Sequence, residues 1–238
     1  LKFERVKTRY LLDRIRVKWP FISEDLNKFS NINNKLIKKV NFFFNDWVKH
    51  NILIDKTGSA RVNYENLKII FEKSNVFTIS IVGKIIQTIG GNEFPPKRIK
   101  TYNLIYSMIF KNLKNKTLGN VKIFLKNNYL FFIREHRNLS ANMEIIKGKH
   151  YLFDGRFLIV SNESGNLILS FGSDLNIINN KSPFFKYKDI INKTIPYLQT
   201  LEGTNIKPYL NIIDANSDIN KKLDNKPFSL YLINRVLV

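Results

Sequence analysis

The stretch Gly90-Gly91-Asn92-Glu93-Phe94-Pro95-Pro96-Lys97-Arg98 joins two helical patterns and carries an aromatic ring and two cations. The glycines predict the end of the first helix, because glycine adopts the left-handed conformation at little cost. The prolines prevent early re-entry into helix. Lys97, Arg98 and Lys100 stand where the next helix begins, although cations are unfavourable there. This corner could bind a phosphate through amides and cations together, or it is a plain connection with solvated cations.

A second set of cations lies in the first stretch of the chain. Residues 1–19 predict a helix that stops at Pro20, and Lys2, Arg5, Arg9 and Arg16 share one face of it because they are three, four and seven residues apart. A cationic stripe of this kind suits a helix lying against a nucleic-acid backbone. The alternative is an ordinary amphipathic helix with a solvated face. Arg134 and Arg137, at the end of a predicted strand, complete the candidate RNA-binding residues.

Residues for catalysis or metal binding are hard to find. The three histidines, His50, His136 and His150, lack metal-ligand spacing, and no close pair of carboxylates suggests acid–base work. Gly83-Lys84 is not a phosphate-binding loop, because the upstream glycine is missing. There is no cysteine, which excludes disulfides and thiolate zinc sites. The residues alone therefore predict a chain that binds rather than catalyses.

The charge balance indicates the class of partner. There are 39 basic and 19 acidic residues among 238, a net charge of +20, which favours a polyanion, with nucleic acid ahead of a membrane surface. Part of the lysine excess fits an AT-rich genome, so the arginines carry more weight. Hydrophobic residues make up 44%, enough for a packed core. No apolar run reaches the length of a membrane span, and we expect a cytoplasmic protein with no membrane partner.

Helical periodicity dominates the first half of the chain. Ser23 is the expected N-cap of a helix that reaches about His50, and its apolar side chains recur at a spacing that predicts a core helix. These side chains are Leu26, Phe29, Leu36, Val40, Phe43 and Trp47. Asn63 and Ser74 are the expected caps of two further helices, the second ending at Gly90. Residues 99–113 predict another helix, which begins at the corner.

The period changes from helix to strand near residues 114–117. Asn127-Asn128 and Asp154-Gly155 predict two-residue hairpins within a meander of about five strands. Residues 186–201 predict a helix up to a break at Pro196, and two strands, 207–213 and 228–238, end the chain. The fold class expected is α+β, with an N-terminal helical domain (1–113) for tRNA recognition followed by a small antiparallel β-meander domain (114–238).

Four motifs in order resemble those of one enzyme family. Phe3-Glu4-Arg5-Val6-Lys7-Thr8-Arg9 is similar to the family's basic helix, and the segment from Gly83 through Gly90-Gly91 to Arg98 is similar to its "IGG…YPPR". Residues 117–120 with 134–138 resemble its "TLGG…REARN". Asp154-Gly155-Arg156-Phe157 resembles "WDGRF", with Phe153 in place of the tryptophan. The family is the bacterial tRNA(Ile)-lysidine synthases, and the chain resembles the C-terminal, non-catalytic portion of the short alphaproteobacterial type, best up to Phe157 and thinly after Phe184.

The resemblance implies a role in an ATP-dependent ligase reaction. The family joins L-lysine to the wobble cytidine of the CAU anticodon of tRNA(Ile), using ATP at an N-terminal Ser-Gly-Gly-x-Asp-Ser loop. No such loop occurs in this sequence, and the chain begins at a leucine, so we expect a fragment without the ATP and lysine sites. tRNA(Ile) is the implied partner, and a homodimer is left open.

Two other functions fit the same residues. The chain could be a free-standing RNA-binding module of another RNA-modifying system, or an interaction domain that does not bind RNA and whose lysines reflect genome composition. An interaction domain of that kind would have no salt-dependent affinity for RNA.

Overall fold

The computed structural model describes residues 2–137, 139, 143–169, 177–214 and 226–236. The chain divides into two compact units, Leu1–Val48 (unit 1) and Lys49–Val238 (unit 2). Asn138 of the resembled motif and the last two residues of the strand predicted at 167–171 lie outside the described residues.

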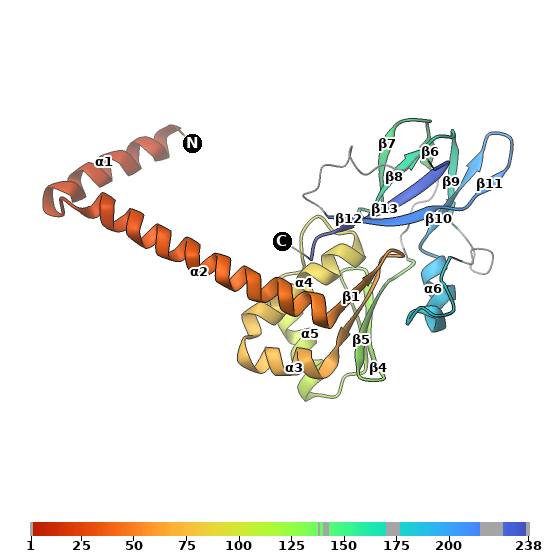
Figure 1. Ribbon diagram of the computed structural model, residues 1–238, viewed down its shortest axis with the longest axis horizontal. Coiled ribbons are helices and arrows are strands. Elements are labelled where there is room, and N and C mark those ends of the chain that lie inside the picture. Colours follow the sequence, from red (N-terminus) through yellow and green to blue (C-terminus); the bar gives the residue numbers. More distant parts are fainter. Residues whose placement is uncertain (1, 138, 140–142, 170–176, 215–225, 237–238) are drawn as a thin grey trace. The chain divides into compact units, whose positions relative to one another are not determined.

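Unit 1 consists of helix α1 (Lys2–Lys18) and most of helix α2 (Ile22–Asn51), joined at a sharp elbow (Figure 1). The elbow is held by side chains from both helices. Arg16 Nε and Nη2 donate to Ser23 Oγ at 3.1 and 3.0 Å, and Trp19 Nε1 donates to Asp25 Oδ2 at 3.1 Å. Ser23 therefore lies inside α2 and accepts from Arg16, instead of being the residue before the helix.

The prediction that α2 is a core helix is wrong. Leu26, Phe29, Leu36, Val40 and Phe43 are between 48% and 64% exposed. Within α2 the buried residues are Ile22 and Val48. Helical spacing shows that one face is apolar, but it does not show what covers that face.

Unit 2 begins with a five-stranded antiparallel sheet, here called sheet A, in the order β1-β2-β5-β4-β3. Three helices accompany it, and α4 packs on β2, β4 and β5 (Figure 1). The caps of α3 and α4 are as predicted, because Asn63 accepts from the Asn66 amide and Ser74 from the Phe77 amide. The element bounds are β1 Ile52–Asp55, β2 Ser59–Asn63, α3 Tyr64–Lys73, α4 Asn75–Gly90, α5 Arg98–Phe110, β3 Asn115–Leu118, β4 Val121–Lys126 and β5 Tyr129–Arg134.

Two four-stranded sheets follow, sheet B in the order β11-β10-β9-β6 and sheet C in the order β12-β13-β8-β7. Their inner faces share a core with residues of β5 such as Phe131 and Ile133. The pairing of β12 with β13 is parallel, and the other pairs are antiparallel. The bounds are β6 Met143–Ile145, β7 His150–Phe153, β8 Phe157–Ser161, β9 Gly165–Leu169, η1 Phe185–Tyr187, α6 Lys188–Asn192, β10 Pro196–Thr200, β11 Asn205–Ile206, β12 Tyr209–Asp214 and β13 Phe228–Asn234.

The α+β class is confirmed, with helices first and antiparallel sheets following. The Asn127-Asn128 hairpin forms as predicted, with positive φ at both residues. The second hairpin forms at the predicted place with positive φ at Asp154 and Gly155, but its turn has three residues and not two, because Phe153 pairs with Phe157 and Arg156 stays in the turn. The single meander is not observed, because its strands are divided among three sheets. The compact units meet at Val48–Lys49 and not at residue 113, since β1 and β2 from the helical half pair into sheet A.

Candidate nucleic-acid interface

The corner at the start of α5 presents its predicted cations to solvent. Lys97, Arg98 and Lys100 are exposed and form no ion pair with any described residue. Lys97 is the N-cap of α5 and makes no side-chain capping bond. The first turn of α5 thus combines amides, which favour an anion, with three side-chain cations that the helix dipole opposes. Phe94 beside them is 71% exposed.

The shape of this corner comes from a junction of three tight turns. Gly91 ends α4 in the left-handed conformation (φ 68°), and its amide donates to the Gln87 carbonyl. Asn92 Nδ2 donates to the Gly119 carbonyl at 2.9 Å. A Cβ on Gly91 would lie 1.8 Å from the Asp154 carbonyl oxygen, so the backbones approach as closely as only glycine permits. The junction brings together three of the four motifs that carry the resemblance, and it positions the corner.

Two buried arginines hold the junction from inside. Arg134 donates to both carboxylate oxygens of Asp154, from Nε at 2.8 Å and from Nη2 at 2.7 Å. Arg156 Nε donates to Asp154 Oδ2 at 2.6 Å and its Nη2 to the Thr194 carbonyl at 2.7 Å. Burial lowers the pKa of Arg156 to about 10, against the opposing effect of the Asp154 charge, so this guanidinium still carries its proton at neutral pH. The Asp154 carboxylate therefore forms ion pairs with two buried arginines.

Arg134 is accordingly a structural residue and does not face a ligand. Its side chain is 4% exposed, and its Nη1 donates to the Asn120 and Glu135 carbonyls. The prediction that it contacts RNA is corrected, because its donors are already taken by Asp154 and the two carbonyls. The sequence placed Arg134 at a strand end but could not show its partner.

The remaining predicted cations are spread over both units. Arg5 and Arg9 are exposed on α1 and form no ion pair with any described residue. Arg16 is occupied at the elbow by Asp13 and Ser23. Arg137 is 77% exposed and lies 3.6 Å from Glu135. The structure therefore does not gather the predicted residues into one site.

A basic and aromatic hollow in unit 2 was missed by the sequence reasoning. It lies on the face of sheet A opposite α4, where the register puts the side chains of Arg61, Lys126 and Tyr129 on one side. The segment containing η1 forms its other wall through Lys186 and Tyr187. It encloses about 300 Å³. We call it the Tyr129 hollow; its lining is Arg61, Lys126, Asn127, Tyr129, Phe131, Asn180, Ser182, Pro183, Phe185, Lys186 and Tyr187.

The aromatic rings of the Tyr129 hollow are fixed by packing and by cations. The Arg61 guanidinium lies 4.5 Å from the centroid of the Tyr129 ring, and Lys126 Nζ lies 5.8 Å from that of Tyr187. Tyr187 packs edge-on against Phe124 at 4.9 Å. Burial raises the pKa of Tyr187, so its phenol stays neutral and adds no negative charge.

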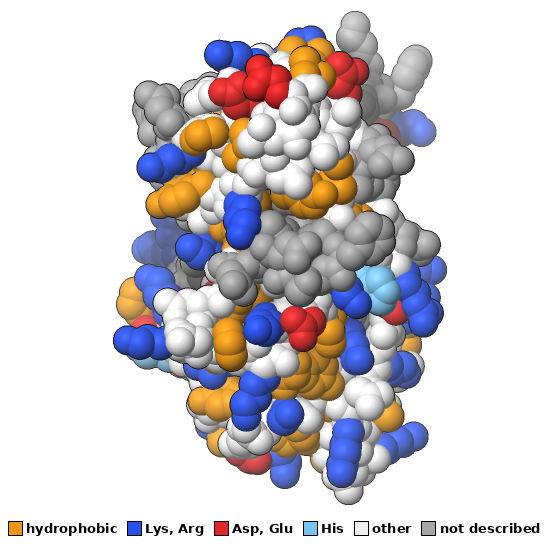
Figure 2. Space-filling model, turned by 90° about the vertical axis from the view of Figure 1, so that its right-hand side faces the viewer, with side chains coloured by type: hydrophobic (Ala, Val, Ile, Leu, Met, Phe, Trp, Pro, Cys, Tyr) orange, Lys and Arg blue, Asp and Glu red, His pale blue; other side chains and the backbone are white. Residues whose placement is uncertain are grey.

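Among the described residues, the lining of the Tyr129 hollow contains three cations and no carboxylate. Arg61, Lys126 and Lys186 form no ion pair with any described residue. A neighbouring depression of about 270 Å³ shares Arg61 and Tyr129 and adds Lys49 and His50, and its described lining has no carboxylate either. Figure 2 shows the same imbalance on one face of the molecule, where Lys and Arg side chains outnumber Asp and Glu. Rings interleaved with unpaired cations are the composition expected where single-stranded nucleic acid binds.

The described residues contain neither a candidate metal site nor a candidate membrane span. Among them, no group of three or more His, Asp or Glu side chains could hold a metal ion. No helix in the described part of the chain is both long and apolar enough to cross a membrane.

The comparisons with known proteins supply no relative. No protein family, no curated protein and no solved structure matches this chain.

Proposed function

We propose that this chain binds tRNA and forms the tRNA-recognition part of an ATP-dependent tRNA(Ile)-lysidine synthase. The observation that carries the RNA-binding proposal is the Tyr129 hollow, where three cations surround two tyrosine rings and no described carboxylate lines the site or pairs with these cations. The cations would neutralise phosphates, and the rings would stack on bases. The exposed cations of the corner, Lys97, Arg98 and Lys100, supply a second point of phosphate contact.

The assignment to lysidine synthesis rests on the sequence resemblance. Three of the four resembled motifs meet in the turn junction, which gives their residue types a structural reason. The sequence lacks the family's ATP-binding loop, so ATP and L-lysine would bind elsewhere in the enzyme. We expect this chain to bind tRNA(Ile) without incorporating lysine into it when ATP is present. Incorporation of lysine into tRNA(Ile) by this chain alone would contradict the proposal that the ATP and lysine sites lie elsewhere in the enzyme.

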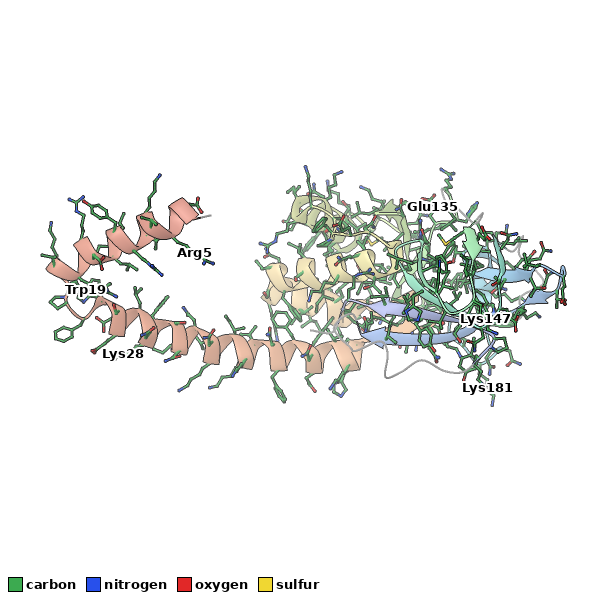
Figure 3. All side chains as sticks on the ribbon, turned by 90° about the horizontal axis from the view of Figure 1, so that it is seen from above. Arg5, Trp19, Lys28, Glu135, Lys147 and Lys181 are labelled. Atoms are coloured by element: carbon green, nitrogen blue, oxygen red, sulfur yellow. The ribbon has the colours of Figure 1, made fainter. Side chains whose placement is uncertain are left out.

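Salt-dependent binding tests the RNA-binding proposal directly. The dissociation constant for tRNA(Ile) is measured by fluorescence anisotropy at several salt concentrations, for the wild type and two double variants. Lys126→Ala with Lys186→Ala removes two cations from the hollow. Lys147→Ala with Lys149→Ala is the control, because it removes the same charge from the exposed turn between sheets B and C (Figure 3).

The hollow variant should bind more weakly, with a salt slope smaller by about one unit for each phosphate that its lysines no longer neutralise. The control should keep most of the wild-type slope. Equal losses of affinity in the two variants would mean that RNA responds only to total charge, and wild-type affinity in the hollow variant would refute the proposed interface. No measurable salt-dependent affinity for any RNA would favour an interaction domain of another kind.

A further inference from the structure

The exposed apolar face of α2 has a seven-residue repeat. The apolar residues of this face follow one another at spacings of three, four or seven residues, which fit the 3.5-residue period of a coiled-coil seam. They are Leu26, Phe29, Leu36, Val40 and Phe43. With Leu26 at position a, the a positions are Leu26, Asn33 and Val40, and the d positions are Phe29, Leu36 and Phe43. We call these six residues the α2 seam.

The rest of α2 obeys the same repeat. Its charged residues outside the seam lie mainly at the outward positions c and f, including Glu24, Lys28, Lys35 and Lys38. Two further apolar side chains, Ile32 and Ile37, flank the seam at g and e and are more than half exposed. Phe42 is the exception, an exposed ring on the outward face. A helix exposed to water on all sides is expected to carry charged residues all round, so a stripe of this length without charges indicates a face that is covered by a partner.

No described residue of unit 1 covers the seam. Between the elbow and the end of the unit, the five apolar seam residues are each about half exposed or more. The described side-chain interactions of α1 with α2 are at the elbow, from which the two helices diverge (Figure 3). On α1, Val6, Tyr10 and Leu11 are exposed. With roughly 100 Å² for each half-exposed side chain, the seam and its two flanking isoleucines offer about 700 Å². That area approaches the roughly 800 Å² per partner of a stable interface.

We propose that the α2 seam pairs in parallel with the α2 seam of a second copy of this chain. Asn33 is the reason for choosing an identical helix in parallel. A parallel pair places Asn33 opposite Asn33, where the two amides can hydrogen bond to each other and fix a two-stranded register. An antiparallel pair would place each Asn33 opposite Leu36 and bring Asp25 near Asp46, burying an unpaired amide and adding a repulsion between like charges. This dimer is independent of the proposed RNA-binding function.

Sedimentation of the whole chain, freed of RNA by nuclease and high salt, tests the association. At roughly 1 to 100 µM, the wild type should approach twice its 28.0 kDa mass. Leu36→Glu puts a charge into the seam and should sediment as a monomer. Asn34→Glu adds the same charge at an outward position and should remain a dimer. A wild type that stays monomeric throughout would overturn the proposal and indicate that another partner covers the seam.

Because the sequence contains no cysteine, single cysteines can test the orientation. Asn33→Cys should form a disulfide-linked dimer with oxidised glutathione as the oxidant, since the two thiols meet in the parallel register. Asn34→Cys, one position away on the outward face, should remain largely unlinked. A dimer in which Asn33→Cys fails to link, or in which both variants link equally, would overturn the parallel seam.

Discussion

Replacing Asp154 by asparagine should destabilise unit 2 strongly. The Asp154 carboxylate accepts from Arg134 and Arg156, both of which are buried. The amide introduced by Asp154→Asn would offer one acceptor oxygen and turn an NH2 group toward the guanidinium donors. Removing one partner from a buried ion pair costs about 3–5 kcal/mol, because the remaining charge is left uncompensated. Asparagine tolerates the positive φ of this position (51°), so the backbone should contribute little to the loss.

The expected size can be checked against the whole stability of a domain. A loss of about 3–5 kcal/mol is a large part of the roughly 5–15 kcal/mol that stabilises a typical domain. For a unit of this size it corresponds to a fall in melting temperature of roughly 10 °C. The matched control is Asp13→Asn, which breaks an exposed pair with Arg16 and should cost less than about 1 kcal/mol.

The assay must separate the two units. Trp19 lies at the elbow of unit 1, so in a Trp47→Phe background its fluorescence follows that unit. Hydrogen exchange of the β5 and β8 amides follows unit 2, and thermal unfolding by circular dichroism gives the melting temperature of the whole chain. Asp154→Asn should accelerate exchange in β5 and β8 and leave the tryptophan transition unchanged. A loss of less than about 1 kcal/mol would refute the idea that one carboxylate holds both arginines.

Three further variants probe other parts of the structure. Gly91→Ala should destabilise unit 2 by roughly 2–4 kcal/mol in a urea titration, since its Cβ would meet the Asp154 carbonyl and its φ is positive. Gly148→Ala, with positive φ but open space around it, should cost only about 1–2 kcal/mol in the same titration. Arg98→Ala should weaken tRNA binding by about 1–3 kcal/mol and leave the melting temperature unchanged, whereas loss of stability without loss of affinity would reject phosphate binding at the corner. Arg5→Ala with Arg9→Ala should lower the salt slope by about two units if α1 contacts phosphates, and an unchanged slope would identify these residues as a solvated face.

The parts of the fold that the sequence predicted are those determined by local physics. The Asn63 and Ser74 caps, the left-handed end of α4 and the two hairpins each depend on a few neighbouring residues. Glycine and asparagine at positive φ, and hydroxyl or amide oxygens at helix starts, carry that information within the local sequence.

What the sequence did not predict depends on pairing between distant segments. β2 pairs with β5, although α3, α4 and α5 lie between these strands in the sequence. That pairing brings Arg61 beside Tyr129. The other wall of the Tyr129 hollow comes from residues 180–187, farther along again. Arg134 has the same residue type as the exposed cations, and only its partner Asp154 distinguishes it. The residue types identified candidate RNA-binding cations, but contacts between segments distant in sequence determine which of these cations face solvent.

The place of β13 in sheet C has a consequence for how the chain folds during synthesis. β13 lies between β8, with which it pairs antiparallel, and β12, with which it pairs parallel. The edge of β8 that does not face β7 therefore has no partner strand until Phe228–Asn234 leaves the ribosome, long after β8 itself has been made. During that interval β8 exposes an unpaired strand edge, which is prone to pairing with other nascent chains. A premature stop before β13 would keep every residue that lines the Tyr129 hollow. We expect the truncated protein to aggregate nevertheless, because the edge of β8 would stay unpaired.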